Sequence, residues 1–236
     1  MNILYRIKRK LYKLSHPELG RILMLHRVVK HRGEGENREL EIAPDYLEQT
    51  IKNYRQKGFR FVSINEVSEI LEKGKVDKPF VCLTFDDGYR DNYTTALPIL
   101  KKEQVPFAIY VTTGFVDNKL LMWWYPNERL GLSRDELLSL DAEPLCTIGA
   151  HTLTHPKLET LSVQEQRVEI KQSKQELESL LGHSVAHFSY PHGSYNDDTI
   201  GIIKECGFCT ALMAWGGVVR KGDDSLQLHR IELRQS

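Results

Sequence analysis

Long apolar runs and cysteines are scarce in this sequence of 236 residues. No apolar run approaches the roughly 18 residues that a membrane-spanning helix needs, so a transmembrane protein is excluded. Only four cysteines are present, which is too few for a disulfide scaffold over this length. Hydrophobic residues at 41% and charged residues at 27% are ordinary for a globular protein. This composition excludes collagen-like, coiled-coil and disordered chains.

An excess of charge of either sign is also missing. The sequence has 32 basic and 32 acidic side chains, whereas a nucleic-acid-binding domain normally carries a strong basic excess. We therefore expect no nucleic-acid partner. The balance is nevertheless uneven along the chain, because residues 1–13 hold five basic groups and no acid. Residues 14–236 are left mildly acidic, with 27 basic against 32 acidic groups.

The N-terminus lacks the apolar segment of 7–15 residues that defines a signal peptide, so we expect a cytoplasmic location. Residues 1–18 form a basic, amphipathic segment, and residues 19–236 form the main domain in this interpretation. One reading of residues 1–14 is peripheral contact with the cytoplasmic face of a membrane. The other reading, at least as well supported, is a helix packed on its own domain. Its apolar face consists of Ile3, Leu4, Ile7, Leu11 and Leu14.

Short apolar runs alternate with amphipathic helical stretches, which is typical of an α/β protein with mostly parallel strands. About seven strands in one chain of this length fit a barrel better than an open sheet. In a barrel, polar residues just after the strands line the mouth of the active site. The expected strands lie at residues 21–26, 59–64, 79–85, 107–112, 147–149, 186–190, 209–213 and 226–233. The polar residues that follow strands are His26, Asp86, Asp87, His151, His155, His192 and His229.

Two of these groups together indicate a metal site. Asp86 and Asp87 follow a strand directly, and two ionised carboxylates held together are costly unless a cation neutralises them. Alone, the Asp-Asp-Gly sequence also fits a plain turn. His151 and His155 are four residues apart, a spacing that places both on one helical face and lets them bind one metal. Two histidines and one aspartate form a catalytic metal site, and the other aspartate remains as a general base.

A third group is the turn at Tyr190, Pro191, His192 and Gly193. A rigid turn of this kind after a strand can direct a backbone N–H toward a developing oxyanion. A simple surface turn is the alternative. The segment Trp123, Trp124 and Tyr125, in the irregular stretch at residues 114–146, fits either a stacking platform for sugar rings or packing in the core.

Residues 83–89 (Leu-Thr-Phe-Asp-Asp-Gly-Tyr), 151–155 (His-Thr-Leu-Thr-His) and 190–193 (Tyr-Pro-His-Gly) resemble the ordered motifs of the polysaccharide deacetylases. This family is also known as carbohydrate esterase family four, with the nodulation-type deacetylase homology domain. The resemblance covers roughly residues 21–233 and implies a distorted (β/α) barrel. It implies Asp86 as the catalytic base and the His192 amide as an oxyanion donor. The implied metal ligands are Asp87, His151 and His155.

The chain departs from the family pattern at two places. Many members carry an arginine two residues before the proline of the third motif, where this chain has Ser189. Arg230, from a neighbouring strand, is our candidate to replace that guanidinium. The C-terminal motif that holds a catalytic acid is also poorly matched, which leaves His26 and His229 as candidates. We favour His26, because its segment resembles the first strand of the subgroup that acts on poly-N-acetylglucosamine-like glycans.

The sequence therefore predicts a metal-dependent hydrolase that removes N-acetyl or O-acetyl groups from a sugar or polysaccharide. Two imidazoles and a carboxylate suit zinc first, with cobalt, nickel or manganese as alternatives. Two other functions stay open: a non-catalytic glycan-binding module on the same scaffold, and a metal-dependent phosphoesterase or amidohydrolase.

Overall fold

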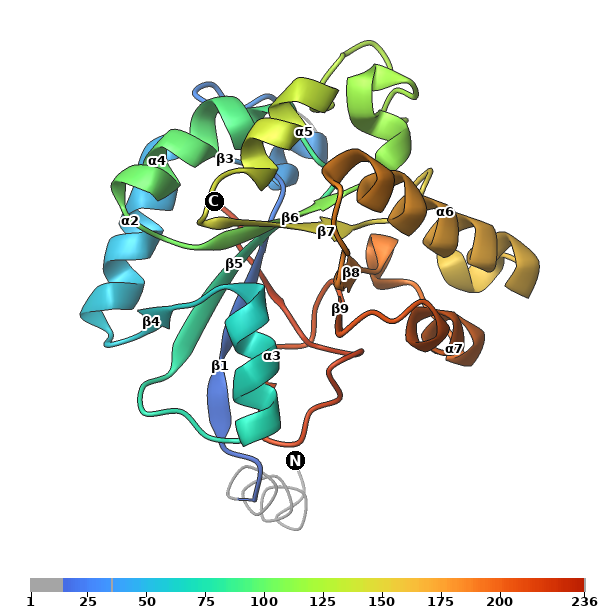
Figure 1. Ribbon diagram of the computed structural model, residues 1–236. Helices are drawn as coiled ribbons and strands as arrows, with labels where there is room; N and C mark the ends of the chain where they lie inside the picture. Colours follow the sequence, from blue (N-terminus) through green and yellow to red (C-terminus); the bar gives the residue numbers. More distant parts are fainter. Residues whose placement is uncertain (1–14, 35, 236) are drawn as a thin grey trace.

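The computed structural model describes residues 15–34 and 36–235 and is built around one curled sheet (Figure 1). Along the sheet the strands follow the order β10-β1-β5-β6-β7-β8-β9, and every neighbouring pair is parallel except β1 with β10. This confirms the prediction of an α/β fold with about seven mostly parallel strands. The strands are β1 (Glu18–Leu25), β5 (Phe80–Phe85), β6 (Phe107–Val111), β7 (Cys146–Ala150), β8 (His187–Ser189), β9 (Thr210–Leu212) and β10 (Val219–Arg220).

The C-terminal segment closes the gap between the two ends of the sheet. The sequence predicts one strand at residues 226–233, but the structure divides it into a bridge and a short strand. Leu228 pairs with Leu212 of β9, and β11 (Ile231–Glu232) then pairs in parallel with β1. The result is a distorted barrel in which Arg230 lies between the two pairings. Two smaller pairings complete the strands: β4 (Arg60–Phe61) lies beside β5, and β2 (Arg27–Val28) pairs with β3 (Glu41–Ile42).

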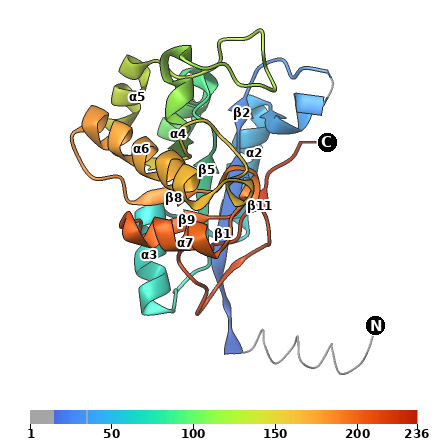
Figure 2. The same ribbon diagram turned by 90° about the vertical axis from the view of Figure 1, so that its right-hand side faces the viewer.

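Helices pack around this curled sheet (Figures 1 and 2). The longest, α6, begins with a capping box of Ser162 and Glu165 and ends before Gly182, which caps it in the left-handed conformation. The helices are α2 (Pro44–Gln56), α3 (Ile64–Lys73), α4 (Leu97–Lys102), α5 (Arg134–Asp141), α6 (Val163–Leu181) and α7 (Asp197–Glu205). Short helical turns are η1 (Glu36–Leu40), η2 (Asn92–Ala96), η3 (Thr113–Asn118), η4 (Leu158–Thr160) and η5 (Pro191–Gly193).

The sheet buries both of its faces, which explains why its strands have continuous apolar sequences. All six residues of β5 are buried, and alternate residues belong to different clusters. Val81 and Leu83 pack in the large cluster that includes α2, α4 and α6, whereas Cys82 packs with Tyr110 and α3 on the other face. Because the strands are parallel, their carboxyl ends lie at one edge, and the chemistry-bearing residues emerge there.

Within the described residues, no helix is both long and apolar enough to cross a membrane. The amphipathic helix predicted for residues 1–14 lies outside the residues that the structure describes, so it stays a prediction, as does the domain boundary at residue 18.

One buried histidine is held uncharged in the core. His187 on β8 is 2% exposed, and its Nε2 lies 2.7 Å from the Asn65 amide oxygen. Because that oxygen only accepts hydrogen bonds, Nε2 carries the proton and Nδ1 accepts from the Thr210 hydroxyl at 2.8 Å. Burial, with a smaller contribution from Lys174, lowers the pKa of His187 to about 4.

This pKa predicts a loss of stability in acid. The unfolded chain takes up the proton near the ordinary pKa of 6.5, whereas folded His187 resists it until about 4. The stability that neutral His187 contributes is therefore fully present above pH 6.5. As the pH falls from 6.5 to about 4, we expect the free energy of unfolding to decrease by up to about 1.4 kcal/mol per pH unit. The free energy of unfolding, measured with urea at several pH values in this range, should change less steeply with pH in His187→Gln than in the unmodified protein. His31→Gln, at an exposed position, should keep the full slope; equal slopes for H187Q and the unmodified protein would contradict the prediction.

Candidate metal centre

Asp86 and Asp87 lie buried at the end of β5, 3% and 2% exposed. The Asp86 N–H still donates to the Leu25 carbonyl, which continues the β1–β5 hydrogen bonding by one residue. The chain then turns sharply, because Asp87 and Gly88 both have positive φ angles of 74° and 76°. The turn separates the two carboxylates into different surroundings.

His151 and His155 emerge from the end of β7 on a loop. The prediction that their spacing reflects one helical face is wrong, because residues 151–155 are not helical. Thr152 and His155 have positive φ angles of 66°, and the His155 N–H donates to the Thr152 hydroxyl at 3.0 Å. A tight loop, rather than a helical turn, brings the two rings together, with centroids 4.9 Å apart.

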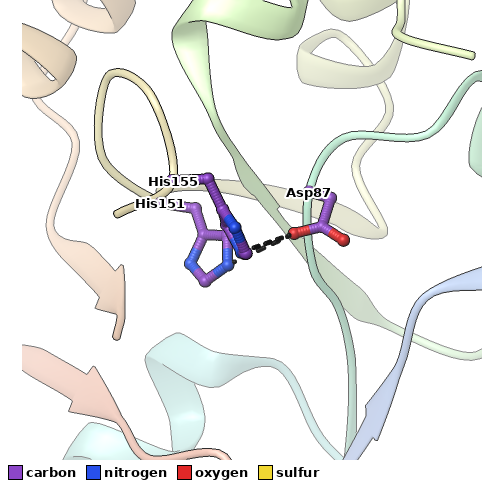
Figure 3. A group of neighbouring side chains, drawn as sticks. All are labelled: Asp87, His151 and His155. Atoms are coloured by element: carbon purple, nitrogen blue, oxygen red, sulfur yellow. Dashed lines mark ion pairs between the residues drawn. The ribbon is translucent and has the colours of Figure 1, made fainter. Parts of the chain in front are cut away.

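The two imidazoles converge on Asp87 (Figure 3). Asp87 Oδ1 lies 3.4 Å from His151 Nε2 and 3.2 Å from His155 Nε2, and the three potential ligand atoms all lie within 4.8 Å of one another. His151 Nδ1 donates to the Ser189 carbonyl at 2.8 Å, so in the neutral ring Nε2 presents a lone pair to Asp87. Such a group resembles the two-histidine, one-carboxylate set of a catalytic metal.

The chemistry of this group fits a divalent cation. Asp87 Oδ1 is buried and makes no hydrogen bond to the described residues. Ligand atoms about 3.3 Å apart are what tetrahedral bonds of 2.0–2.1 Å require. Burial opposes ionisation of Asp87, but attraction to His155 and His151 holds its pKa well below the usual range. Burial also lowers the pKa of His155 more than Asp87 raises it. The site thus combines an ionised carboxylate with an imidazole that favours its neutral, metal-binding form.

Asp86 has a different partner. The Arg230 guanidinium donates to both of its carboxylate oxygens, at 2.8 and 2.6 Å, and Arg230 is 1% exposed. Burial opposes ionisation of Asp86, but Arg230, and next His151, outweigh it and lower its pKa. Because Ser189 stands where many family members carry an arginine, we expected Arg230 to supply that guanidinium, and its contact with Asp86 is present.

Ser189 is a site residue that the sequence reasoning noted only as a departure. Its hydroxyl donates to Asp86 at 3.2 Å and accepts from Arg230 at 2.9 Å, while its carbonyl orients His151. Ser189 therefore connects the metal group to the Asp86–Arg230 pair. The signal in the sequence was its position two residues before Pro191, where many family members carry an arginine.

The turn after β8 leaves one free candidate for an oxyanion donor. The Tyr190 N–H donates to Leu212, and Pro191 has no N–H, so the His192 amide is the remaining member of the predicted set. His192 has a positive φ of 57° and its ring lies 4.5 Å from that of His155. Burial, helped by His155, lowers the pKa of the His192 ring to about 4. Tyr190 is a buried support that donates its hydroxyl to the Leu226 carbonyl.

A cavity of about 340 Å³ opens over these groups. Asp86, Asp87, His151 and His155 line it, together with His26. His229 does not line this cavity; its ring packs beside Gly216, with Nδ1 3.3 Å from the Trp215 carbonyl. Of the two candidate acids, the structure thus brings only His26 to the site.

Aromatic side chains form the walls of the cavity. Trp124 packs on His155 with ring centroids 4.8 Å apart and donates its indole N–H to Tyr89 at 2.7 Å. Tyr125 is buried, but Trp123 is 67% exposed at the cavity, so the three aromatics divide between packing and an open platform. Trp215, 64% exposed, lines the same cavity and was missed because its sequence surroundings carry no motif.

Comparison with known proteins agrees with this geometry. A family model for polysaccharide deacetylases matches residues 73–211, more than half of the chain. The chain is 25% identical to YxkH of Bacillus subtilis over 94% of this chain and 74% of that protein. The deacetylase PplD of Streptococcus pyogenes, solved in complex with acetate, has a TM-score of 0.79 and 28% identity. The match covers 91% of this chain and 92% of that one.

A further relative is longer than this chain. The poly-β-1,6-N-acetyl-D-glucosamine N-deacetylase of Staphylococcus aureus is 26% identical over 180 residues. The match covers 73% of this chain and 60% of the Staphylococcus protein.

The Asp86–Arg230 pair predicts a strong, non-additive effect of mutation. Arg230→Met leaves an ionised carboxylate buried without its partner, so we expect a loss of about 3–5 kcal/mol in the free energy of unfolding. Asp86→Asn in the same chain should recover a large part of this loss, because it removes the uncompensated charge. Urea unfolding of both single variants and the double variant measures the coupling.

Arg234→Met is the matched control, since Arg234 is half exposed and its ion pairs with Glu39 and Glu232 lie at the surface. It should change stability by no more than about 1 kcal/mol. An effect of Arg230→Met as small as this would show that Asp86 does not depend on the guanidinium.

Proposed function

The chain belongs to the polysaccharide deacetylase family, and on this premise we propose that it removes N-acetyl groups from a glycan by metal-dependent hydrolysis. The observation that carries the proposal is the placement of an ionised carboxylate, Asp86, beside the Asp87–His151–His155 group in one cavity. A site that only bound metal would have no need of Asp86 and its buried arginine.

Asp87, His151 and His155 would hold the cation. When bound, it supplies Lewis acidity to the acetyl carbonyl and to the attacking water. Zinc suits this ligand set first, and cobalt, nickel or manganese fits it as well. The Ser189 carbonyl fixes the His151 ring through Nδ1, which would leave Nε2 free to bind the cation.

Asp86 acts as the general base in this proposal. It accepts the proton from the attacking water, while Arg230 and Ser189 hold both carboxylate oxygens in place. Arg230 is a positioning residue, since its guanidinium is wholly occupied by Asp86, Thr84, Ser189 and the Met213 carbonyl.

Two further groups complete the reaction. The His192 amide donates to the oxyanion that develops on the acetyl carbonyl. Protonated His26 donates to the departing amine, because a sugar amine leaves poorly as an anion. His26 is our choice over His229 because it lines the cavity.

The substrate we propose is a β-1,6-linked N-acetylglucosamine polymer, the glycan named for the Staphylococcus relative. The open cavity with exposed Trp123 and Trp215 at its walls suits sugar rings. O-acetyl groups, whose leaving group is a sugar hydroxyl, are the alternative substrate. A cytoplasmic location, with or without membrane contact by residues 1–14, remains a prediction from the sequence.

The alternative functions find less support. A binuclear phosphoesterase gathers more carboxylates around two metals, whereas one group of three metal-binding side chains occurs in the described part of the chain. A glycan-binding module would not need the buried Asp86–Arg230 pair.

Removal of the base should slow turnover strongly and leave metal binding intact. We expect Asp86→Asn to lower kcat for acetate release from N-acetylglucosamine oligomers by about 10²–10⁴-fold, with zinc affinity changed little. Asp197→Asn, an exposed site on α7, is the control. Glycan binding without acetate release by the unmodified protein would favour the binding module. Phosphatase activity that survives Asp86→Asn, with no deacetylation, would favour the phosphoesterase.

The acid is identified by a paired comparison. His26→Gln should lower kcat for acetate release by about 10²-fold or more, because the amine then leaves without a proton donor. His229→Gln should leave kcat within about twofold, since its ring lies outside the cavity. The assignment fails when the two variants show the reverse order or when neither lowers kcat.

A further inference from the structure

Glu169 is a buried carboxylate on α6 that the reaction proposed above does not use. It is 9% exposed and accepts three hydrogen bonds, all from the loop that carries the two histidines. Its Oε2 accepts from the Leu153 and Thr154 amides, both at 2.9 Å, and its Oε1 accepts from the Thr154 hydroxyl at 2.7 Å. These three hydrogen bonds link α6 to the loop.

The loop needs such support because its backbone is strained. Thr152 and His155, on either side of the two clamped residues, both have φ angles of 66°. A β-branched residue rarely adopts this conformation, and each such residue costs about 1–3 kcal/mol that the surrounding structure must offset. On the opposite side, the Thr113 and Gly114 amides donate to the Thr152 and Leu153 carbonyls. Among the described residues, Glu169 supplies the only side-chain carboxylate that accepts hydrogen bonds from the backbone amides of this loop.

The two histidines differ in how their rings are fixed. The His151 ring is tethered directly by the Ser189 carbonyl. His155 Nδ1 is buried and has no hydrogen-bond partner among residues 15–34 and 36–235. The His155 ring therefore depends on packing against Trp124 and His192 and on the position of its own backbone. That backbone follows directly after Thr154, which Glu169 holds.

We infer that Glu169 is a positioning residue for the metal: by holding Leu153 and Thr154, it sets the separation of His151 and His155 and thereby the affinity of the site. This inference rests on the proposed metal site. Its prediction concerns metal affinity, not only activity, because an outer group that orients ligands typically changes affinity by 10–100-fold.

The structure provides a matched control one turn earlier on the same helix. Gln166 is 1% exposed and uses its side chain to contact the Leu161 carbonyl and the Thr199 hydroxyl. It is buried, as Glu169 is, but makes no hydrogen bond to residues 151–155. Gln166→Ala should therefore destabilise the fold without changing the metal site.

Zinc dissociation constants of the metal-free protein, measured by calorimetry or chelator competition, test the inference. We expect Glu169→Ala to weaken zinc binding by about 10–100-fold. Glu169→Asp keeps the charge but cannot reach the loop, so it should weaken binding similarly and serves where Glu169→Ala does not fold. Glu169→Gln should stay within about threefold of the unmodified protein, because its amide oxygen can accept both N–H groups and its NH₂ can donate to Thr154.

The outcomes separate this inference from the proposed function. If the unmodified protein binds no zinc, the proposed metal site is wrong. If it binds zinc and Asp87→Asn abolishes binding, but Glu169→Ala or Glu169→Asp binds as tightly as the unmodified protein, then Glu169 is only structural. A loss of affinity in Gln166→Ala as large as in Glu169→Ala would overturn the inference as well, since it would reflect general destabilisation.

Discussion

Two adjacent ionised carboxylates are buried at the end of β5, and the architecture around them compensates that charge. Asp86 and Asp87 are each almost fully buried, and neither could remain ionised there without a positive partner. The positive φ at Asp87 turns the two side chains toward different partners. Asp86 takes a guanidinium from within the protein, whereas Asp87 faces two imidazoles whose geometry fits a cation. The separation keeps Asp86, the proposed base, distinct from Asp87, the proposed metal ligand.

This constraint explains the course of the C-terminal segment. A sheet of this order could end at β9 with an open edge, yet the chain returns past Leu228 to pair β11 with β1. Arg230 lies between these two pairings, and its buried guanidinium donates hydrogen bonds to Asp86. Residues 228–232 therefore both close the barrel and neutralise Asp86. Truncation of this segment would remove a structural closure and an active-site partner together.

The sequence predicted those features that local patterns encode. Apolar runs identified the buried strands, and the polar residues after them identified the edge where Asp87 and His151 meet. The helical reading of His151 and His155 failed, because spacing alone does not distinguish one helical turn from a tight loop whose strain is offset by distant contacts. Glu169 and Trp215 were not found, since what gives them importance is a neighbour far away in the chain. Arg230 was found as a candidate because Ser189 stands where many family members carry an arginine, and the structure shows its guanidinium on Asp86, while its role in the reaction stays a prediction.

Backbone strain is concentrated at the residues of the candidate site. Seven non-glycine residues have positive φ angles in the described chain, and four of them, Asp87, Thr152, His155 and His192, belong to the site. Each such residue costs about 1–3 kcal/mol, so the surrounding hydrogen bonds must hold the backbone in conformations it would leave if released. Side chains fixed in this way would not have to reorganise when a cation binds, which would favour binding. Local strain is thus the means by which a small set of ordinary side chains becomes a preorganised site.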